Sequence, residues 1–184
     1  MTKIYCKLTD QKMRTHNGFQ WVLGKKEIIK KKGGSLCTDA YFHCYEHPLL
    51  AVLLNSMHAN IKNPRLFLIE VGGENKEDNG LKCGFKEMTL IEEIKLPEIS
   101  INQKIAFGIL CALEVYKEES FVKWANNWLN NVDRSKTSAN AAAAADAYAN
   151  YAYAAAYVAY SAYADAAYAN LDLISIAKKA LTYN

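Results

Sequence analysis

Residues 41–54 read YFHCYEHPLLAVLL, and within these positions the pattern changes from that of a strand to that of a helix. Tyr41–Cys44 is rich in β-formers, whereas Pro48 suits the first turn of a helix, where its missing N–H has no helical partner in any case. The leucine- and valine-rich run that follows is apolar on most sides, and Asn63-Pro64 would end it. We therefore expect one core helix packed against a sheet.

Short apolar runs separated by turn residues fill residues 1 to about 100, a pattern typical of β-strands. Eight of the nine glycines and all three prolines lie there. Asn79-Gly80 predicts a tight hairpin turn, and Gly33-Gly34 and Gly72-Gly73 also indicate turns. We expect strands at Lys3–Leu8, Phe19–Leu23, Glu27–Lys30, Tyr41–Cys44, Arg65–Val71, Leu81–Phe85 and Thr89–Lys95.

The second half of the chain favours helices, because no glycine or proline follows Gly108. Apolar residues recur at steps of three and four from Ile105 to Tyr116. Ser120 is suited to cap the N-terminus of a next helix. That helix would carry its aromatic residues on one face: Phe121, Trp124 and Trp128.

Residues 139–169 contain 18 alanines and 7 tyrosines in 31 positions, and Asp133 precedes them as a possible helix cap. Alanine is the strongest helix former, so we expect a helix here. A straight helix from Ser138 to Leu181 would be about 65 Å long, which exceeds the roughly 30–40 Å width of a domain of this size. The helix either projects and assembles with copies of itself, which we favour, or breaks near Asn150 or Asn170 and folds back.

The chain is therefore predicted to be an α+β protein. A small, mostly antiparallel sheet with one packed helix is followed by an all-helical C-terminal half that ends in a long alanine- and tyrosine-rich helix. We expect an α+β domain at residues 1–100, a connecting pair of helices at 101–137, and the helical tail at 138–184.

Composition excludes several classes of protein. The net charge of +3 is too small to indicate nucleic acid binding, and 22% charged with 51% apolar residues is typical of a globular chain. No apolar run approaches the roughly 20 residues of a membrane helix, and no signal peptide opens the chain, so we expect a cytoplasmic protein. The five cysteines form no Cys-x-x-Cys pair and are expected to be buried free thiols, with no metal and no cofactor.

The richest set of chemically active side chains surrounds the strand at Tyr41–Cys44. His43 and Tyr45 would lie near the start of the Pro48 helix, whose free N–H groups suit an anion. Arg14 and Lys25 are the nearest plausible cations, so we name His43, Tyr45, Arg14 and Lys25 as candidate ligand-binding residues. In the alternative interpretation, His43 is a half-buried core residue and His47 is a surface cap. No catalytic residues are assigned.

Five lysines cluster around Glu27-Ile28-Ile29 and admit two interpretations. Lysines protect exposed strand edges from pairing with other chains, which favours a solvated hairpin edge. A rim that attracts anions is the functional alternative. The lysines are Lys25, Lys26, Lys30, Lys31 and Lys32.

The chain resembles a family of uncharacterised proteins that are common in bacteriophage genomes and occur in some bacteria. The resemblance rests on Leu36-Cys37-Thr38-Asp39, then His43 and Tyr45, then PLLAVLLN at residues 48–55, followed by the alanine- and aromatic-rich tail. It implies an origin in a phage and lends no established activity.

We expect a non-enzymatic phage accessory protein, for example one that counters a host defence, acting in the host cytoplasm. It would bind a host component or a small anionic ligand, and would form a homo-oligomer through its tail. One alternative is an enzyme that acts on a nucleotide-like substrate through His43 and Tyr45. Another is a purely structural oligomer.

Overall fold

The computed structural model of the chain describes residues 4–135, 137–138 and 171–184. The chain divides into two compact units, Met1–Glu98 and Ile99–Asn184. The first unit holds the sheet and two short helices, and the elements described in the second unit are helical. The predicted α+β class is confirmed.

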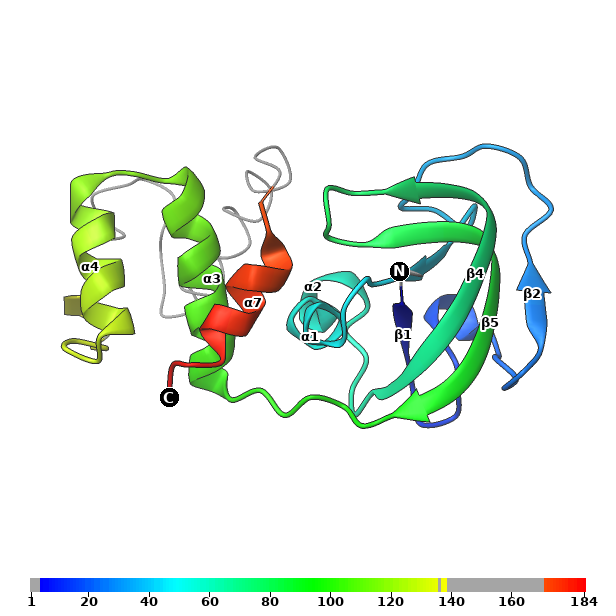
Figure 1. Cartoon of the computed structure of the whole chain (residues 1–184), viewed down its shortest axis with the longest axis horizontal. Coiled ribbons are helices and arrows are strands. Elements are labelled where there is room, and N and C mark those ends of the chain that lie inside the picture. Colours follow the sequence, from blue (N-terminus) through cyan, green and yellow to red (C-terminus); the bar gives the residue numbers. More distant parts are fainter. Residues whose placement is uncertain (1–3, 136, 139–170) are drawn as a thin grey trace. The chain divides into compact units, whose positions relative to one another are not determined.

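The first unit is built on a five-stranded antiparallel sheet (Figure 1). Strands pair in the order β1-β4-β5-β2, and β3 pairs with β5 as well. The strands are β1 (Tyr5–Thr9), β2 (Lys26–Ile28), β3 (Phe42–Cys44), β4 (Arg65–Glu77) and β5 (Cys83–Ile94). The helical elements of this unit are a 3-10 turn, η1 (His16–Gly18), and helices α1 (Pro48–Leu53) and α2 (Asn55–His58).

A backbone bridge between Cys6 and Tyr45 connects β1 to the end of β3. The Cys6 N–H donates to the Tyr45 carbonyl at 2.8 Å, and the Tyr45 N–H donates back at 2.9 Å. Because β1 also pairs with β4, these bonds complete a ring of β1, β4, β5 and β3. One cluster of buried side chains from these strands and the loop before β2 forms the core: Trp21, Cys44, Phe67, Ile69, Cys83, Phe85, Met88 and Leu90.

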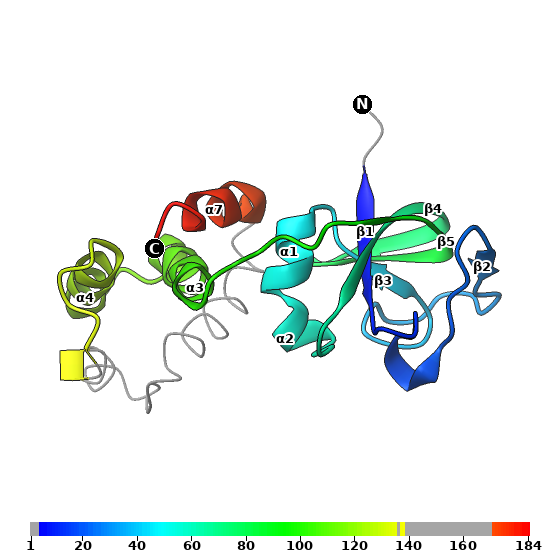
Figure 2. The same ribbon diagram turned by 90° about the horizontal axis from the view of Figure 1, so that it is seen from below.

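The helix predicted after Pro48 begins at that residue but is interrupted. The His47 ring accepts a hydrogen bond from the Leu49 N–H at 3.1 Å and caps α1. Leu54 separates α1 from α2, so the single expected helix is two short ones. Figure 2 shows α1 beside β1 and β2 at the opposite margin of the unit.

Several of the predicted strands are wrong in extent or kind. Residues 19–23 form no strand, because left-handed backbone at Asn17, Gly18 and Gly24 turns the chain on both sides of them. The segments expected at Leu81–Phe85 and Thr89–Lys95 are one continuous strand, β5. The polar residues between them do not interrupt it, because the Lys86 side chain is buried and bonded to backbone carbonyls.

The Asn79-Gly80 turn between β4 and β5 is confirmed. Asn79 and Gly80 both have positive φ, and the Leu81 N–H donates to the Asp78 carbonyl at 2.7 Å. Gly72-Gly73, in contrast, does not end a strand. It lies inside β4 at an irregularity in the pairing with β5, so the long hairpin continues past it.

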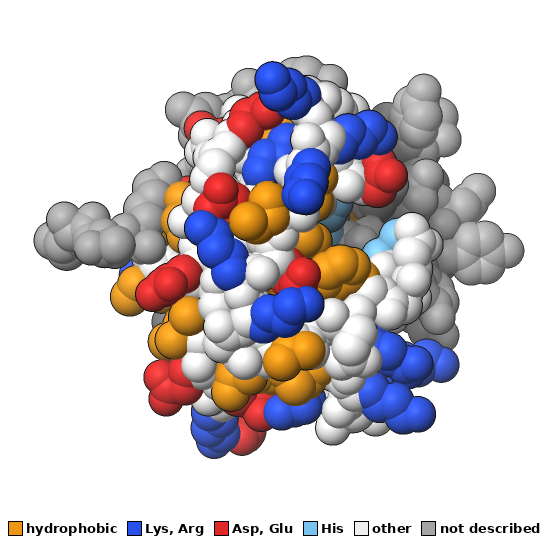
Figure 3. All heavy atoms as spheres, turned by 90° about the vertical axis from the view of Figure 1, so that its right-hand side faces the viewer, with side chains coloured by type: hydrophobic (Ala, Val, Ile, Leu, Met, Phe, Trp, Pro, Cys, Tyr) orange, Lys and Arg blue, Asp and Glu red, His pale blue; other side chains and the backbone are white. Residues whose placement is uncertain are grey.

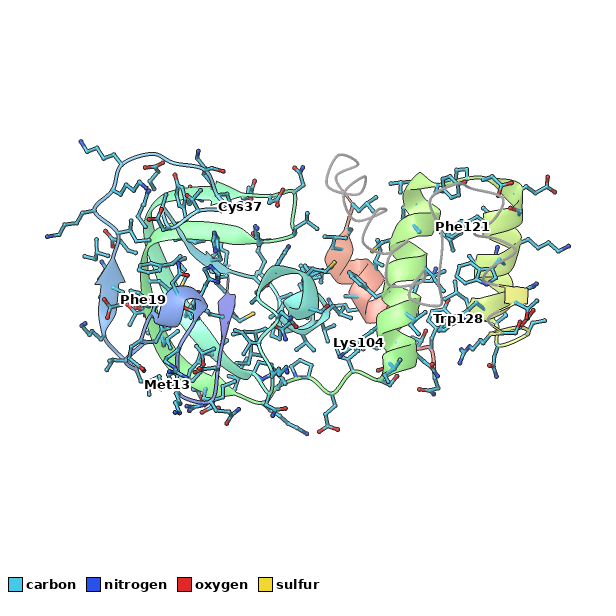
Figure 4. The ribbon with its side chains drawn as sticks, turned by 180° about the vertical axis from the view of Figure 1, so that it is seen from behind. Met13, Phe19, Cys37, Lys104, Phe121 and Trp128 are labelled. Atoms are coloured by element: carbon cyan, nitrogen blue, oxygen red, sulfur yellow. The ribbon has the colours of Figure 1, made fainter. Side chains whose placement is uncertain are left out.

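The second unit contains α3 (Ile101–Val115), α4 (Glu119–Leu129) and α7 (Leu173–Ala180) among its described residues. Ser100 and Gln103 form a capping box at the start of α3. Glu118, not the predicted Ser120, caps α4, because its carboxylate accepts from the backbone N–H groups of the first turn. The expected aromatic face of α4 is buried, and Figure 4 shows Phe121 and Trp128 on the side of α4 nearest α3.

Helix α7 returns the end of the chain to α3. Asp172 caps it, and the Gln103 side-chain amide donates to the Leu181 carbonyl at 2.9 Å. Leu171 and Asp172 are not helical, so no single helix continues to Leu181 from the tail. The predicted alanine- and tyrosine-rich helix at residues 139–169 lies outside the described residues. Among the helices that are described, none combines the length and the apolar character that crossing a membrane requires.

Candidate functional site

His43 lies in β3, half-buried, with its ring turned to the loop that precedes the strand. Its Nε2 contacts the Leu36 carbonyl, which only accepts, so Nε2 carries the proton in this arrangement. Burial, and then the positive charges of Lys7 and Lys82, lower the pKa of His43, while the Leu36 contact opposes them. A neutral imidazole with its N–H bonded to backbone is the expected result at neutral pH.

Tyr45 follows β3 and is buried against a histidine of α2. Its hydroxyl lies 3.2 Å from His58 Nδ1, and the two rings are nearly parallel with centroids 5.8 Å apart. Burial is the first cause that lowers the pKa of His58 to about 4, and it also raises the pKa of Tyr45. At neutral pH, therefore, the Tyr45 O–H donates to a neutral His58 ring and ties β3 to α2.

Each of the two predicted cations forms an ion pair with a carboxylate close to it in the sequence. Arg14 Nε and a terminal guanidinium nitrogen are each 3.0 Å from an Asp10 oxygen, and Lys25 is 2.8 Å from Glu27. Within the described residues, no hydrogen bond or ion pair connects either cation to His43 or Tyr45. The four-residue ligand site stays a prediction. Of its members, only His43 and Tyr45 lie on the same segment of the structure.

The five lysines named above are exposed and are called here the lysine edge: Lys25 directly precedes β2, Lys26 lies in it, and the other three lie in the loop after it. Three of them have carboxylate partners: Lys25 on Glu27, Lys26 on Glu87 and Lys31 on Asp39. Lys30 and Lys32 have no partner among the residues that the structure describes. The lysine edge therefore keeps an excess of positive charge after its ion pairs are formed.

Two further lysines fix the backbone of this loop at the paired glycines. Lys86 Nζ donates to the carbonyls of Gly33 and Ala40 at 2.8 and 2.6 Å, and Lys76 Nζ donates to the Gly34 carbonyl at 2.8 Å. Lys86 Nζ also lies 4.0 Å from the centroid of the Tyr41 ring, which supplies a cation–π contact. These contacts hold the loop that carries Lys30, Lys31 and Lys32.

Neither Lys76 nor Lys86 is among the candidate residues predicted from the sequence. The sequence gives only a weak sign of their role, because Lys86 falls between two predicted strands, just after Phe85. Only the pairing of β4 with β5 shows which loop both amines reach.

Four of the five cysteines are buried free thiols, as expected, and Cys37 is exposed instead (Figure 4). Lys82 Nζ lies 3.1 Å from Cys37 Sγ. Nowhere in the described part of the chain do three or more His, Cys, Asp or Glu side chains gather as they would around a metal ion.

A family model described as a domain of unknown function, DUF7666, matches residues 3–102. The chain belongs to the DUF7666 family. The match ends close to the division between the two units, so it covers β1 to β5 together with the lysine edge. The expectation of an uncharacterised family is confirmed for this domain. No curated protein matches the chain, and no solved structure does.

Proposed function

We propose that the chain is a non-enzymatic binding protein whose DUF7666 domain takes up an anionic partner at the lysine edge. The observation that carries this proposal is the excess charge of Lys30 and Lys32 on a loop that Lys76 and Lys86 hold in place. A fixed array of like charges attracts an opposite one without the entropic cost of first ordering the loop.

We also propose that the protein acts in a host cell infected by a phage. The resemblance of residues 36–55 to phage proteins supports an accessory role in an infected host, in which the partner is a host component or a small anionic ligand of the host cytoplasm. Interference with a host defence is one such role.

An enzyme that acts through His43 and Tyr45 is less well supported. Both side chains that would carry the chemistry have partners: His43 bonds to the Leu36 carbonyl, and the buried Tyr45 hydroxyl bonds to His58. A general acid or base must reach its substrate within hydrogen-bonding distance, and these two groups are used inside the fold.

The test compares two double variants with the same loss of charge. Lys30→Gln/Lys32→Gln removes the two unpaired lysines of the lysine edge, and Lys62→Gln/Lys123→Gln removes two exposed lysines elsewhere. Binding of fluorescein-labelled poly-L-glutamate and of tripolyphosphate to the full chain is measured at about 0.15 M ionic strength, where the Debye length is about 8 Å. We expect the first variant to weaken binding at least about fivefold and the second less than about twofold, because screening confines the effect to nearby charges.

Equal losses in the two variants would show that only the net charge matters, and absence of binding to both probes would refute the proposal. Far-UV circular dichroism of each variant establishes that the fold is retained.

A further inference from the structure

β2 leaves one row of backbone hydrogen-bonding groups unused. The Ile29 N–H donates to the Lys86 carbonyl at 2.8 Å, and the register pairs Ile28 with Glu87. Hydrogen-bonded and non-hydrogen-bonded pairs alternate in antiparallel strands, so the N–H and C=O groups of Lys26 and Ile28 point away from β5. Among the described residues, none bonds to these groups. Figure 1 shows β2 at the margin of the sheet.

Exposed aliphatic side chains accompany this row. Ile28 is 54% exposed, and Leu23 and Val22, just before β2, are 52% and 49% exposed. Figure 3 shows the face that includes β2, where basic, apolar and acidic side chains are interspersed. An edge with free backbone groups and alternating side chains is the surface to which an extended peptide adds as a strand.

Charge decides which chain fits this edge. A second copy of β2 would bring five more lysines against the first five, which opposes pairing between copies of the protein. An acidic strand instead places its carboxylates beside Lys26, Lys30 and Lys32. The charge of the lysine edge therefore disfavours pairing with a second copy of β2 and favours pairing with an acidic strand.

Nucleic acid fits this edge less well than a peptide. Proteins that bind single strands stack the bases on exposed aromatic rings. Phe19 is the exposed aromatic residue nearest in sequence to β2, and its ring already packs on Trp21 and Phe42, with centroids 4.9 and 5.3 Å away. The exposed apolar residues next to β2 are aliphatic, as a peptide side chain requires.

We propose that β2 binds an acidic, extended segment of a partner protein by strand addition, with main-chain bonds to Lys26 and Ile28 and ion pairs to the lysine edge. This inference rests on the proposed function and specifies its partner. Alternate residues of the added strand share a face, so a segment that alternates acidic and β-branched residues matches the edge.

The test uses a labelled peptide of alternating glutamate and valine with blocked ends, and a control peptide of the same sequence in which the backbone nitrogen of every residue is N-methylated, so that it cannot donate main-chain hydrogen bonds. Binding to the full-length protein is followed by fluorescence anisotropy. Amide hydrogen exchange at Lys26 and Ile28 is followed by NMR. We expect the first peptide to bind at least about tenfold more tightly than the second, because strand addition depends on the ladder. We also expect it to slow exchange at the Ile28 N–H.

Two substitutions of Ile28 separate the backbone from the side chain. Ile28→Pro removes an N–H that points away from β5, so no bond of the sheet is lost, and proline is tolerated at such edge positions. Ile28→Thr keeps the N–H and also loses the aliphatic side chain. We expect the proline variant to weaken peptide binding at least about fivefold relative to the threonine variant.

The outcomes distinguish this inference from the proposed function. Binding of poly-L-glutamate with no preference between the two peptides, and with unchanged exchange at Ile28, would overturn strand addition and leave the anionic site standing. Absence of binding to any anionic probe would overturn both. Tighter binding of single-stranded DNA than of a peptide of equal charge would overturn the choice of a peptide. If Ile28→Pro does not fold, the strand-addition proposal is still tested by amide exchange at Ile28 in the unaltered protein, measured with and without the first peptide.

Discussion

Lys7 is a charged residue placed inside the apolar interior of the sheet. Its side chain is only 6% exposed, its Nζ donates to the His43 carbonyl at 2.6 Å, and the Trp21 ring centroid lies 4.9 Å away. One carbonyl and one aromatic face replace only part of the water that an ammonium group binds. Burial accordingly lowers the pKa of Lys7 from its ordinary 10.5 to about 8.

This lowered pKa makes stability depend on pH in a defined window. Between pH 8 and 10.5 the unfolded chain holds the Lys7 proton and the folded chain has released it. The unfolded state therefore binds more protons, and the free energy of unfolding rises with pH across this window. The gap between the two pKa values corresponds to roughly 3 kcal/mol.

We predict that Lys7→Met removes this dependence. The difference in unfolding free energy between the natural chain and the variant should shift by roughly 3 kcal/mol in favour of the natural chain from pH 7 to pH 10.5. Urea denaturation at several pH values measures it, and subtraction cancels the groups that titrate in both proteins. Lys62→Met, an exposed control, should give a flat difference. A flat difference for Lys7→Met would mean that the amine is not held in the interior.

The paired glycines Gly33 and Gly34, between β2 and β3, determine the path of the loop that carries Lys30, Lys31 and Lys32. Gly34 has φ +106°, and a Cβ built there would lie 2.4 Å from the Cβ of Ala40. Gly33 has φ +62°, and a Cβ there would meet nothing within 4 Å. Only Gly34 is therefore closely packed, although both adopt backbone that disfavours side chains.

Gly34→Ala should consequently cost more than Gly33→Ala. We expect a loss of about 2–3 kcal/mol for Gly34→Ala, from strain together with the clash, and about 1 kcal/mol for Gly33→Ala, from strain alone. Urea unfolding of both variants measures this. Gly34→Ala should also weaken the binding of poly-L-glutamate, since the displaced loop carries Lys30 to Lys32. Equal stability of the two variants would contradict the close approach of Gly34 to Ala40.

The same elements show what sequence can and cannot predict. The Asn79-Gly80 turn and the start of α1 at Pro48 depend on local backbone preferences, and both were predicted correctly. The continuity of β5 was not, because burial of Lys86 depends on carbonyls of Gly33 and Ala40 that are distant in sequence.

The candidate site divides in the same way. The five lysines of the lysine edge are visible as a cluster in the sequence, and Lys25 is the one cation that they share with the predicted site. The unused backbone groups of Lys26 and Ile28 follow only from the pairing register with β5. A sequence shows which charges are neighbours along the chain, whereas sheet pairing decides which edge is open.

Within the second unit, the C-terminal helix α7 packs on α3. Leu173, Ala177 and Ala180 of α7 are buried, and Gln103 bonds to the Leu181 carbonyl. Residues 139–170, between these anchored parts, contain the alanines and tyrosines that decided the prediction of self-assembly. Removing everything after Ala139 would also strip α7 from α3, so a deletion cannot isolate the role of this segment.

We predict that replacing residues 139–170 with a glycine-serine linker of equal length lowers the oligomeric state and leaves both units folded. Tyrosine rings favour apolar contacts with bonded or wet hydroxyls, and alanines allow helices to approach closely, which suits contacts between copies of the segment. Sedimentation velocity at tens of micromolar measures the change. The binding of poly-L-glutamate at the lysine edge should stay the same per protomer. If the natural chain is itself a monomer at these concentrations, the segment does not assemble the protein and the alternative, in which it folds back on its own chain, is correct.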